Sequence, residues 1–195
     1  GTIVDATFVD APRQRNSRDE NKKIKDGEIP EEWEKPENKS KLAQKDIDAD
    51  WTKKNGERHF GYKDHVKCDA DSKLITNYSV TSASVHDSQR CLVFIGQEDE
   101  VLYADSAYSG KPIALALPEN CKNQICEKGY RNSPLTSEQK MNNRRKSKIR
   151  CRIEHIFGFM TGAMHGITIR SIGVTRAWMN IGITNLVYTF AGTVT

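Results

Sequence analysis

The chain has 195 residues and a mass of 22.1 kDa, enough for one sizeable domain. Hydrophobic residues make up 36% and charged residues 29% of it, a polar composition that is still typical of a globular protein. No apolar run approaches the roughly 20 residues of a transmembrane helix, and the first residues lack the basic and apolar regions of a signal peptide. We therefore expect no membrane contact. The sequence opens as if already within a β-strand, so we also expect a further region to precede it.

The five cysteines are an odd number and do not form the paired spacing of a disulfide framework. Cys121 and Cys126 are five positions apart and no CxxC pair is present, which argues against a structural zinc site. Reduced, buried thiols in a cytosolic protein are the simplest interpretation.

Charge is distributed unevenly along the chain, although the net charge is only +4. Residues 1–105 carry 17 basic and 22 acidic side chains, whereas residues 106–195 carry 13 basic and 4 acidic ones. The densest basic stretch contains no acidic residue and comprises Lys140, Arg144, Arg145, Lys146, Lys148, Arg150 and Arg152. A solvated helix face could carry such a row, but unpaired cations repel one another unless an anion lies nearby. The pattern therefore favours nucleic acid as a partner.

The predicted elements begin with a strand over Thr2–Val9, which is rich in β-forming residues. In residues 10–56, which follow, 24 of the 47 side chains are charged, with equal numbers of acids and bases. This stretch has few large apolar residues besides Trp33 and Trp51, so it lacks the material for a core of its own. We expect a charged insertion that lies over the domain or is partly disordered.

The elements after the insertion are predicted from periodicity and from turn residues. They are a hairpin of two strands (59–68 and 74–80), a helix capped by Asp87, a buried strand at 101–104, a short helix at 110–117 and a strand at 123–126. Apolar residues then recur at helical spacing from Ile149 to Met164, and a last helix is expected from about Arg176 to Phe190. This order predicts an α/β fold in which helices pack on a mixed sheet.

Three carboxylates stand in settings that ordinary surface residues avoid. Asp5 lies among β-forming residues in the first strand, and Asp105 directly follows a buried strand, where α/β sheets place functional groups. Glu154 lies on the flank of the apolar helix stripe, and Arg150, four residues earlier, shares that flank. Buried carboxylates need compensating cations, and their oxygens suit Mg²⁺ or Mn²⁺. Two such ions support phosphodiester chemistry, although a lone strand carboxylate can also simply cap or pair.

Five blocks of sequence resemble one protein family in the same order along the chain. The blocks are Val4–Thr7, Phe60–His65, Thr81–Ser88, Tyr103–Gly110 and Arg150–Gly158. Together they resemble the catalytic domain of bacterial insertion-sequence transposases of the DDE class, specifically the insertion-sequence-five type. The resemblance spans almost the whole chain and is weakest over residues 10–56.

This resemblance implies a ribonuclease-H-like mixed sheet flanked by helices, forming one DDE catalytic domain over residues 1–195, with a charged insertion at 10–56 after the first strand. It assigns Asp5, Asp105 and Glu154 as the catalytic residues, and these would hold two Mg²⁺ or Mn²⁺ ions. The implied activity is cleavage of DNA strands at the element ends, followed by transfer of the 3′-hydroxyl into target DNA. The implied setting is the bacterial cytoplasm at the nucleoid, with a homodimer or higher assembly on DNA and an N-terminal DNA-binding region absent from this chain.

The resemblance also assigns Arg150 to a position that grips DNA phosphate. Two positions depart from the family signature, since Ser147 replaces an expected tyrosine and Thr161 an expected lysine. His86 and Asp87 match a family block, but a turn with an N-cap explains them better than a catalytic pair. The residues expected to contact DNA are Arg144, Arg145, Lys146, Lys148, Arg150, Arg152 and Lys63, the last of which is equally well explained as a solvated strand lysine.

Two other functions are compatible with the sequence. A metal-dependent nuclease of the same fold would hydrolyse DNA without joining it. A relic of a transposase would keep the basic helix and only bind DNA, although the complete set of three acidic residues argues against decay. A joining assay with pre-cut ends would distinguish the nuclease from a transposase. The lack of a specific divalent-metal site would favour the relic that only binds DNA.

Overall fold

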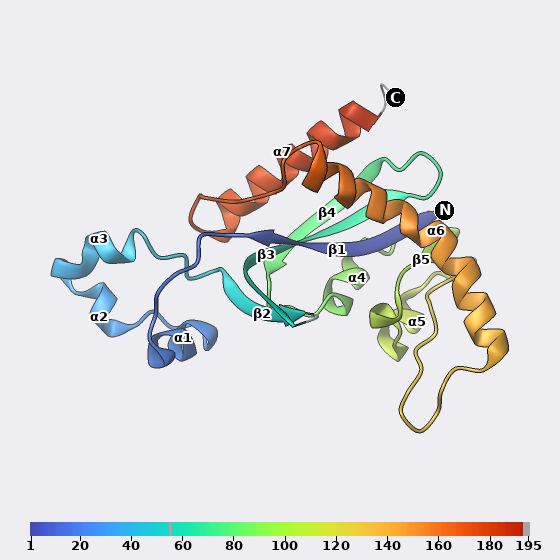
Figure 1. Ribbon diagram of the computed structural model, residues 1–195, viewed down its shortest axis with the longest axis horizontal. Coiled ribbons are helices and arrows are strands. Elements are labelled where there is room, and N and C mark those ends of the chain that lie inside the picture. The colour runs from blue at the N-terminus through green and yellow to red at the C-terminus, as the bar shows by residue number, and fades with distance from the viewer. Residues whose placement is uncertain (55, 193–195) are drawn as a thin grey trace.

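The computed structural model describes residues 1–54 and 56–192, and within them six strands form one mixed sheet (Figure 1). β1 (Thr2–Asp10) lies in the middle, pairing antiparallel with β3 (Glu57–Asp69) and parallel with β5 (Val101–Tyr103). β6 (Lys122–Asn123) extends the parallel side, while β2 (Asp50–Lys54) and β4 (Ile75–Ser82) both pair with the outer edge of β3. An antiparallel half joined to a parallel half is the mixed sheet expected of a ribonuclease-H-like fold.

Alternation along the central strands sends side chains to both faces of the sheet. On one face, Ile3 packs with Ile153, Ile156 and Met160 of α6 (Ser137–Gly162). Further along the same face, Val9 packs with Ala177 and Ile181 of α7 (Val174–Gly192), and Figure 1 shows the C-terminal end of α6 meeting α7 at an angle. The sheet therefore has one face covered by the two long C-terminal helices.

Shorter helices cover the opposite face. Val4, which alternation turns away from Ile3, packs with Cys91 and Phe94 of α4 (Ser88–Phe94) and with Ile113 of α5 (Lys111–Ala116). A 3₁₀ turn, η2 (Ser106–Tyr108), links β5 to α5. The chain is thus a three-layer α/β structure, with a sheet between two layers of helices.

The charged insertion after β1 contains α1 (Arg18–Lys25), α2 (Glu31–Glu34), η1 (Pro36–Asn38) and α3 (Lys39–Leu42). In Figure 1 these helices form a lobe that projects from one end of the sheet. Trp33 is fully buried in it, donates a hydrogen bond from Nε1 to Glu20 Oε1 at 2.7 Å, and has Lys41 and Lys45 over its ring. The lobe therefore has a small core around one aromatic side chain.

Most element predictions are confirmed, with corrections at their ends. The strand predicted at 123–126 is the two-residue β6, and the long helix ends at Gly162, before Met164. It ends there because His165 and Gly166 take left-handed backbone angles, with φ of 61° and 81°. No helix in the described part of the chain is both long and apolar enough to span a membrane.

Candidate active site

Asp5 lies on β1, and Asp105 lies just beyond the end of the neighbouring parallel strand β5. The register of β1 and β5 pairs Ile3 with Tyr103. Asp5 follows Ile3 by two residues, and Asp105 follows Tyr103 by two residues. The register therefore brings Asp105, just beyond the end of β5, to the level of Asp5 on β1. Asp105 also accepts a hydrogen bond from the backbone N–H of Ala107 at 2.6 Å, which caps η2 and fixes the carboxylate just beyond the strand.

The third carboxylate is brought to the same region by α6. Arg150 donates a hydrogen bond from Nη1 to Asp5 Oδ2 at 2.9 Å and another from Nη2 to Glu154 Oε1 at 2.5 Å. The second contact confirms that Arg150 and Glu154 share one flank of the helix. One guanidinium group therefore joins a residue of β1 to the glutamate of α6.

Asp5 is strongly affected by its surroundings, since its side chain is only 16% exposed. Burial raises its pKa to about 6, although the N–H of Ala6 and the charge of Arg150 act in the other direction. The charge of Asp105 raises this pKa further, so the two aspartates interact electrostatically. Burial alone would lower the pKa of Arg150, but Asp5 and Glu154 raise it above its ordinary value.

The donor chemistry of this region suits a hard divalent cation, because carboxylate oxygens are the ligands that Mg²⁺ and Mn²⁺ prefer. A buried hydroxyl lies nearby without a partner: Tyr108 Oη has no hydrogen-bond partner among the described residues, and burial followed by the charges of Asp5 and Asp87 raises its pKa, which keeps it protonated. Within the described part of the chain, however, no three His, Cys, Asp or Glu side chains lie close enough together to hold a metal ion. Arg150 instead contacts two of the three carboxylates.

Comparison with known families decides the identity of the chain. Residues 1–190 match the family described as "Transposase DDE domain". This chain belongs to the DDE transposase family. No solved structure matches it. The expectation of a DDE transposase domain, acting in DNA transposition and recombination, is therefore confirmed, while the insertion-sequence-five type stays a prediction.

The basic row of the transposase domain divides into two sets. Arg144, Arg145 and Lys148 are exposed on α6. Lys146 instead donates a hydrogen bond to the carbonyl of Ile125 at 2.9 Å, and Arg152 contacts the carbonyl of Ala70 and the carboxylate of Asp71. The first set is therefore open to an external anion, whereas the second also ties α6 to neighbouring loops.

Lys63 lies apart from this row, on the opposite face of the sheet from α6. Its Nζ donates hydrogen bonds to Asp87 Oδ1 at 2.8 Å and to the carbonyl of Val85 at 2.7 Å, and its side chain is 10% exposed. Asp87 stands at the N-cap position of α4, but its side chain does not cap the helix. The predicted N-cap position of Asp87 is confirmed, but its carboxylate pairs with a buried lysine instead of capping the helix.

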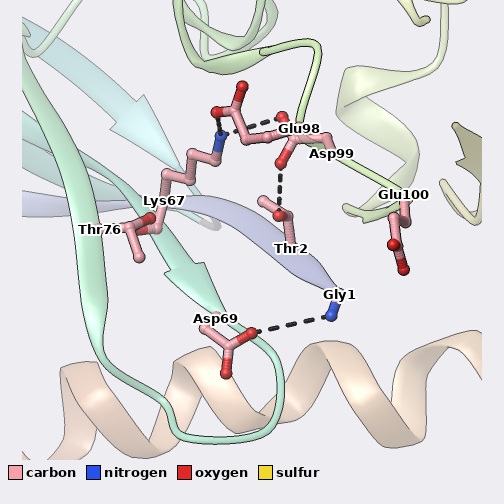
Figure 2. Close-up of a pocket in the computed structure, with 8 residues that line it drawn as sticks. All are labelled: Gly1, Thr2, Lys67, Asp69, Thr76, Glu98, Asp99 and Glu100. Carbon is pink, nitrogen blue, oxygen red and sulfur yellow. Dashed lines mark hydrogen bonds and ion pairs between the residues drawn. The ribbon is translucent and has the colours of Figure 1, made fainter.

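Sequence reasoning missed a second lysine anchor on the same strand (Figure 2). Lys67 Nζ contacts Asp99 Oδ2 at 2.9 Å, Glu98 Oε1 at 3.3 Å and the carbonyl of Phe94 at 2.9 Å, and Asp99 also accepts a bond from Thr2. Lys63 and Lys67 therefore hold the two ends of α4 against β3. The signal available for them was the polar side of the alternating strand, on which Lys63, His65 and Lys67 recur at every second position.

Proposed function

We propose that this domain cuts DNA strands at the ends of a mobile element and joins the freed 3′-hydroxyl to target DNA. The observation that carries the proposal is the position of Asp5 and Asp105, each two residues beyond the paired Ile3 and Tyr103 of adjacent parallel strands, with Glu154 joined to Asp5 through Arg150. Asp5, Asp105 and Glu154 would hold two Mg²⁺ or Mn²⁺ ions. Such ions, when bound, make an attacking oxygen more nucleophilic and stabilise the leaving oxygen.

The residues of the domain have distinct tasks in this proposal. Asp105 is fixed by its bond to the Ala107 N–H, so its carboxylate is oriented before any ligand arrives. Asp5 lies in a partly water-excluded setting, which strengthens its attraction for a cation. The exposed cations Arg144, Arg145 and Lys148 would follow the phosphate backbone, which gives salt-dependent binding with little sequence information. Recognition of the element ends would then depend on a region outside this chain.

The experiment that tests the proposal compares the wild type with Asp105→Asn on a DNA duplex that carries an element end. We expect Asp105→Asn to abolish strand cleavage while DNA affinity, measured without divalent metal, stays within about twofold, because only one metal-binding oxygen is exchanged for an amide. Equal cleavage by both proteins would contradict the proposal. Pre-cut ends and a plasmid target then test joining, and cleavage without joining would identify a nuclease.

We also propose that the domain acts as a homodimer or higher assembly on DNA. On α7, Met179, Ile183, Leu186 and Val187 recur at helical spacing and are between 47% and 63% exposed. Contiguous exposed apolar surface of this kind marks interaction sites. The chain carries no charged side chain after Arg176, so a second copy could meet this face without charge repulsion. The place of action would be the bacterial cytoplasm at the nucleoid, where the DNA substrate lies.

A further inference from the structure

The contacts of Arg150 raise a question about how the carboxylates become available. Asp5 Oδ1 accepts the N–H of Ala6 at 2.8 Å, and its other oxygen, Oδ2, accepts from Arg150. Glu154 gives Oε1 to the same guanidinium group. The arginine therefore neutralises two of the three carboxylates in the position where a divalent cation would do so.

We propose that Arg150 is an internal counter-ion that moves: it holds Asp5 and Glu154 in the DNA-free protein and transfers to a DNA phosphate when DNA binds. This inference rests on the proposed function, because it takes Asp5 and Glu154 as the cation ligands. The transfer frees both carboxylates at the moment when substrate arrives. Metal affinity is thereby coupled to DNA binding.

The charges around Asp5 support the first half of this exchange. Asp5, Asp105 and Glu154 would repel one another if no cation lay between them. Arg150 acts on Asp5 more strongly than Lys54, the other cation that affects its pKa. The remaining basic side chains of α6 nearby are occupied elsewhere, since Lys146 bonds to Ile125 and Arg152 to Ala70 and Asp71. Arg150 is thus the main cation that offsets the charge of Asp5, beside the N–H of Ala6, which acts on this carboxylate more strongly.

The geometry also supports release of the arginine. Glu154 is 54% exposed, so its bond with Arg150 is a surface pair four residues apart on a helix, and solvent weakens such a pair. The contact with Asp5 is the stronger one, because both side chains there are less than 20% exposed. A guanidinium fork matches carboxylate and phosphate equally well, but it cannot grip both at full strength. A phosphate can therefore take the place of the carboxylates as its partner.

Thermodynamic linkage turns this exchange into a measurable coupling. A divalent cation and Arg150 compete for Asp5, so removal of the arginine should strengthen metal binding in the absence of DNA. DNA that draws the arginine away should have the same effect on the wild type. By reciprocity, the metal should strengthen DNA binding by the same factor.

The test measures Mn²⁺ affinity by electron paramagnetic resonance of the free ion, first without DNA. We expect Arg150→Gln to bind Mn²⁺ at least about fivefold more tightly than the wild type. Arg170→Gln, a matched loss of one exposed arginine remote in sequence from the site, should leave the affinity unchanged. Asp5→Asn should abolish the gain in the Arg150→Gln background, which assigns the ion to this site. Equal or weaker Mn²⁺ binding by Arg150→Gln, or no binding to either protein, overturns the inference.

A second variant guards against a folding defect, which circular dichroism would reveal. Arg150→Lys keeps the positive charge but cannot bridge two carboxylates, so its Mn²⁺ affinity should lie between those of the wild type and Arg150→Gln. If Arg150→Gln does not fold, an Arg150→Lys affinity equal to that of the wild type overturns the inference.

A duplex of DNA added to the same titration tests the transfer itself. DNA should increase the Mn²⁺ affinity of the wild type and of Arg170→Gln, and increase that of Arg150→Gln by a smaller factor. If DNA increases the Mn²⁺ affinity of Arg150→Gln by the same factor as that of the wild type, phosphate acts on the ion directly. That result would overturn the proposed transfer of Arg150 to phosphate. Strand cleavage by the wild type, measured in parallel, separates the two proposals. If the wild type cleaves DNA but Arg150→Gln binds Mn²⁺ no more tightly, only the counter-ion role of Arg150 is refuted. If Arg150→Gln binds Mn²⁺ more tightly but the wild type does not cleave DNA, only the proposed function is refuted.

Discussion

Asn185 on α7 donates a hydrogen bond from Nδ2 to Asp64 Oδ1 on β3 at 3.2 Å, in the interior of the protein. Asp64 is completely buried and Asn185 is 2% exposed. Asp64 Oδ2 and Asn185 Oδ1 have no hydrogen-bond partner among the described residues. A protonated carboxyl group avoids a buried charge and also supplies a donor, so this pair favours a neutral Asp64.

The stability of the domain should therefore depend on pH through Asp64. Burial raises its pKa to about 7, although the bond from Asn185 acts the other way. Between about pH 4 and pH 7 the folded protein keeps a proton on Asp64 that the unfolded chain releases. The contribution of Asp64 to the free energy of unfolding is therefore complete below about pH 4 and is lost as pH rises through about 7. Chemical denaturation at several pH values measures it.

Asp64→Asn is the variant that isolates this dependence. An amide is neutral at every pH, so the variant should lose this part of the pH dependence and exceed the wild type in stability at pH 8, by about 1–3 kcal/mol. A wild type whose stability does not fall between pH 4 and pH 8 relative to the variant would show that Asp64 is ionised in the folded protein.

Lys63 should act mainly on stability rather than on DNA. Lys63→Met leaves the Asp87 carboxylate, which is only 18% exposed, without its partner, so we expect a loss of about 3 kcal/mol in the free energy of unfolding. Lys53→Met, which removes an exposed strand lysine, should change stability by less than about 0.5 kcal/mol. If Lys63→Met unfolds like the wild type but binds DNA more weakly, the lysine serves the DNA interface instead.

The two sets of basic residues on α6 should differ in how they affect DNA binding. The double variant Arg144→Gln/Arg145→Gln removes two exposed cations, so we expect the slope of log affinity against log salt concentration to fall by about two. Lys146→Gln/Arg152→Gln removes cations that already have partners in the protein and should reduce the slope by less. Fluorescence anisotropy at several salt concentrations measures both slopes. Equal reductions of the slope by the two double variants would contradict the division of the basic residues into two sets.

The apolar face of α7 should control assembly. Ile183→Glu/Leu186→Glu places charges on this face, so we expect the variant to sediment as a monomer under conditions in which the wild type associates. Leu115→Glu is the matched control, because Leu115 is an exposed apolar residue of α5, on the other side of the sheet. A wild type that remains monomeric with and without DNA would refute this interface.

The sequence allowed prediction of the parts of the fold that depend on local pattern. The β-forming residues of β1 and the alternation over β3 placed these strands near their observed bounds, whereas the apolar stripe from Ile149 marked only the C-terminal half of α6, which begins at Ser137. The setting of Asp105 after a short apolar strand was also visible, because strand ends and turn residues are local signals. The shared flank of Arg150 and Glu154 followed from helical geometry alone.

Features that depend on contacts between distant residues could not be predicted in this way. The bond between Arg150 and Asp5 joins residues 145 positions apart, and the pairing of Lys63 with Asp87 spans 24. Neither separation leaves a trace in periodicity or composition. The helices of the insertion were missed for another reason: their apolar content is concentrated in Trp33, so hydrophobic patterning gave almost no signal.

A Mn²⁺ titration by calorimetry in the presence of duplex DNA shows whether Asp105 belongs to an assembled divalent-metal site. Asp105→Asn should lose the tightest Mn²⁺ binding seen with the wild type. Glu100→Gln, which removes an exposed carboxylate elsewhere in the domain, should retain it. Loss of the tightest Mn²⁺ binding in Asp105→Asn alone is the result expected if Asp105 is a ligand of the metal site. Equal Mn²⁺ binding by the wild type and Asp105→Asn would contradict this assignment.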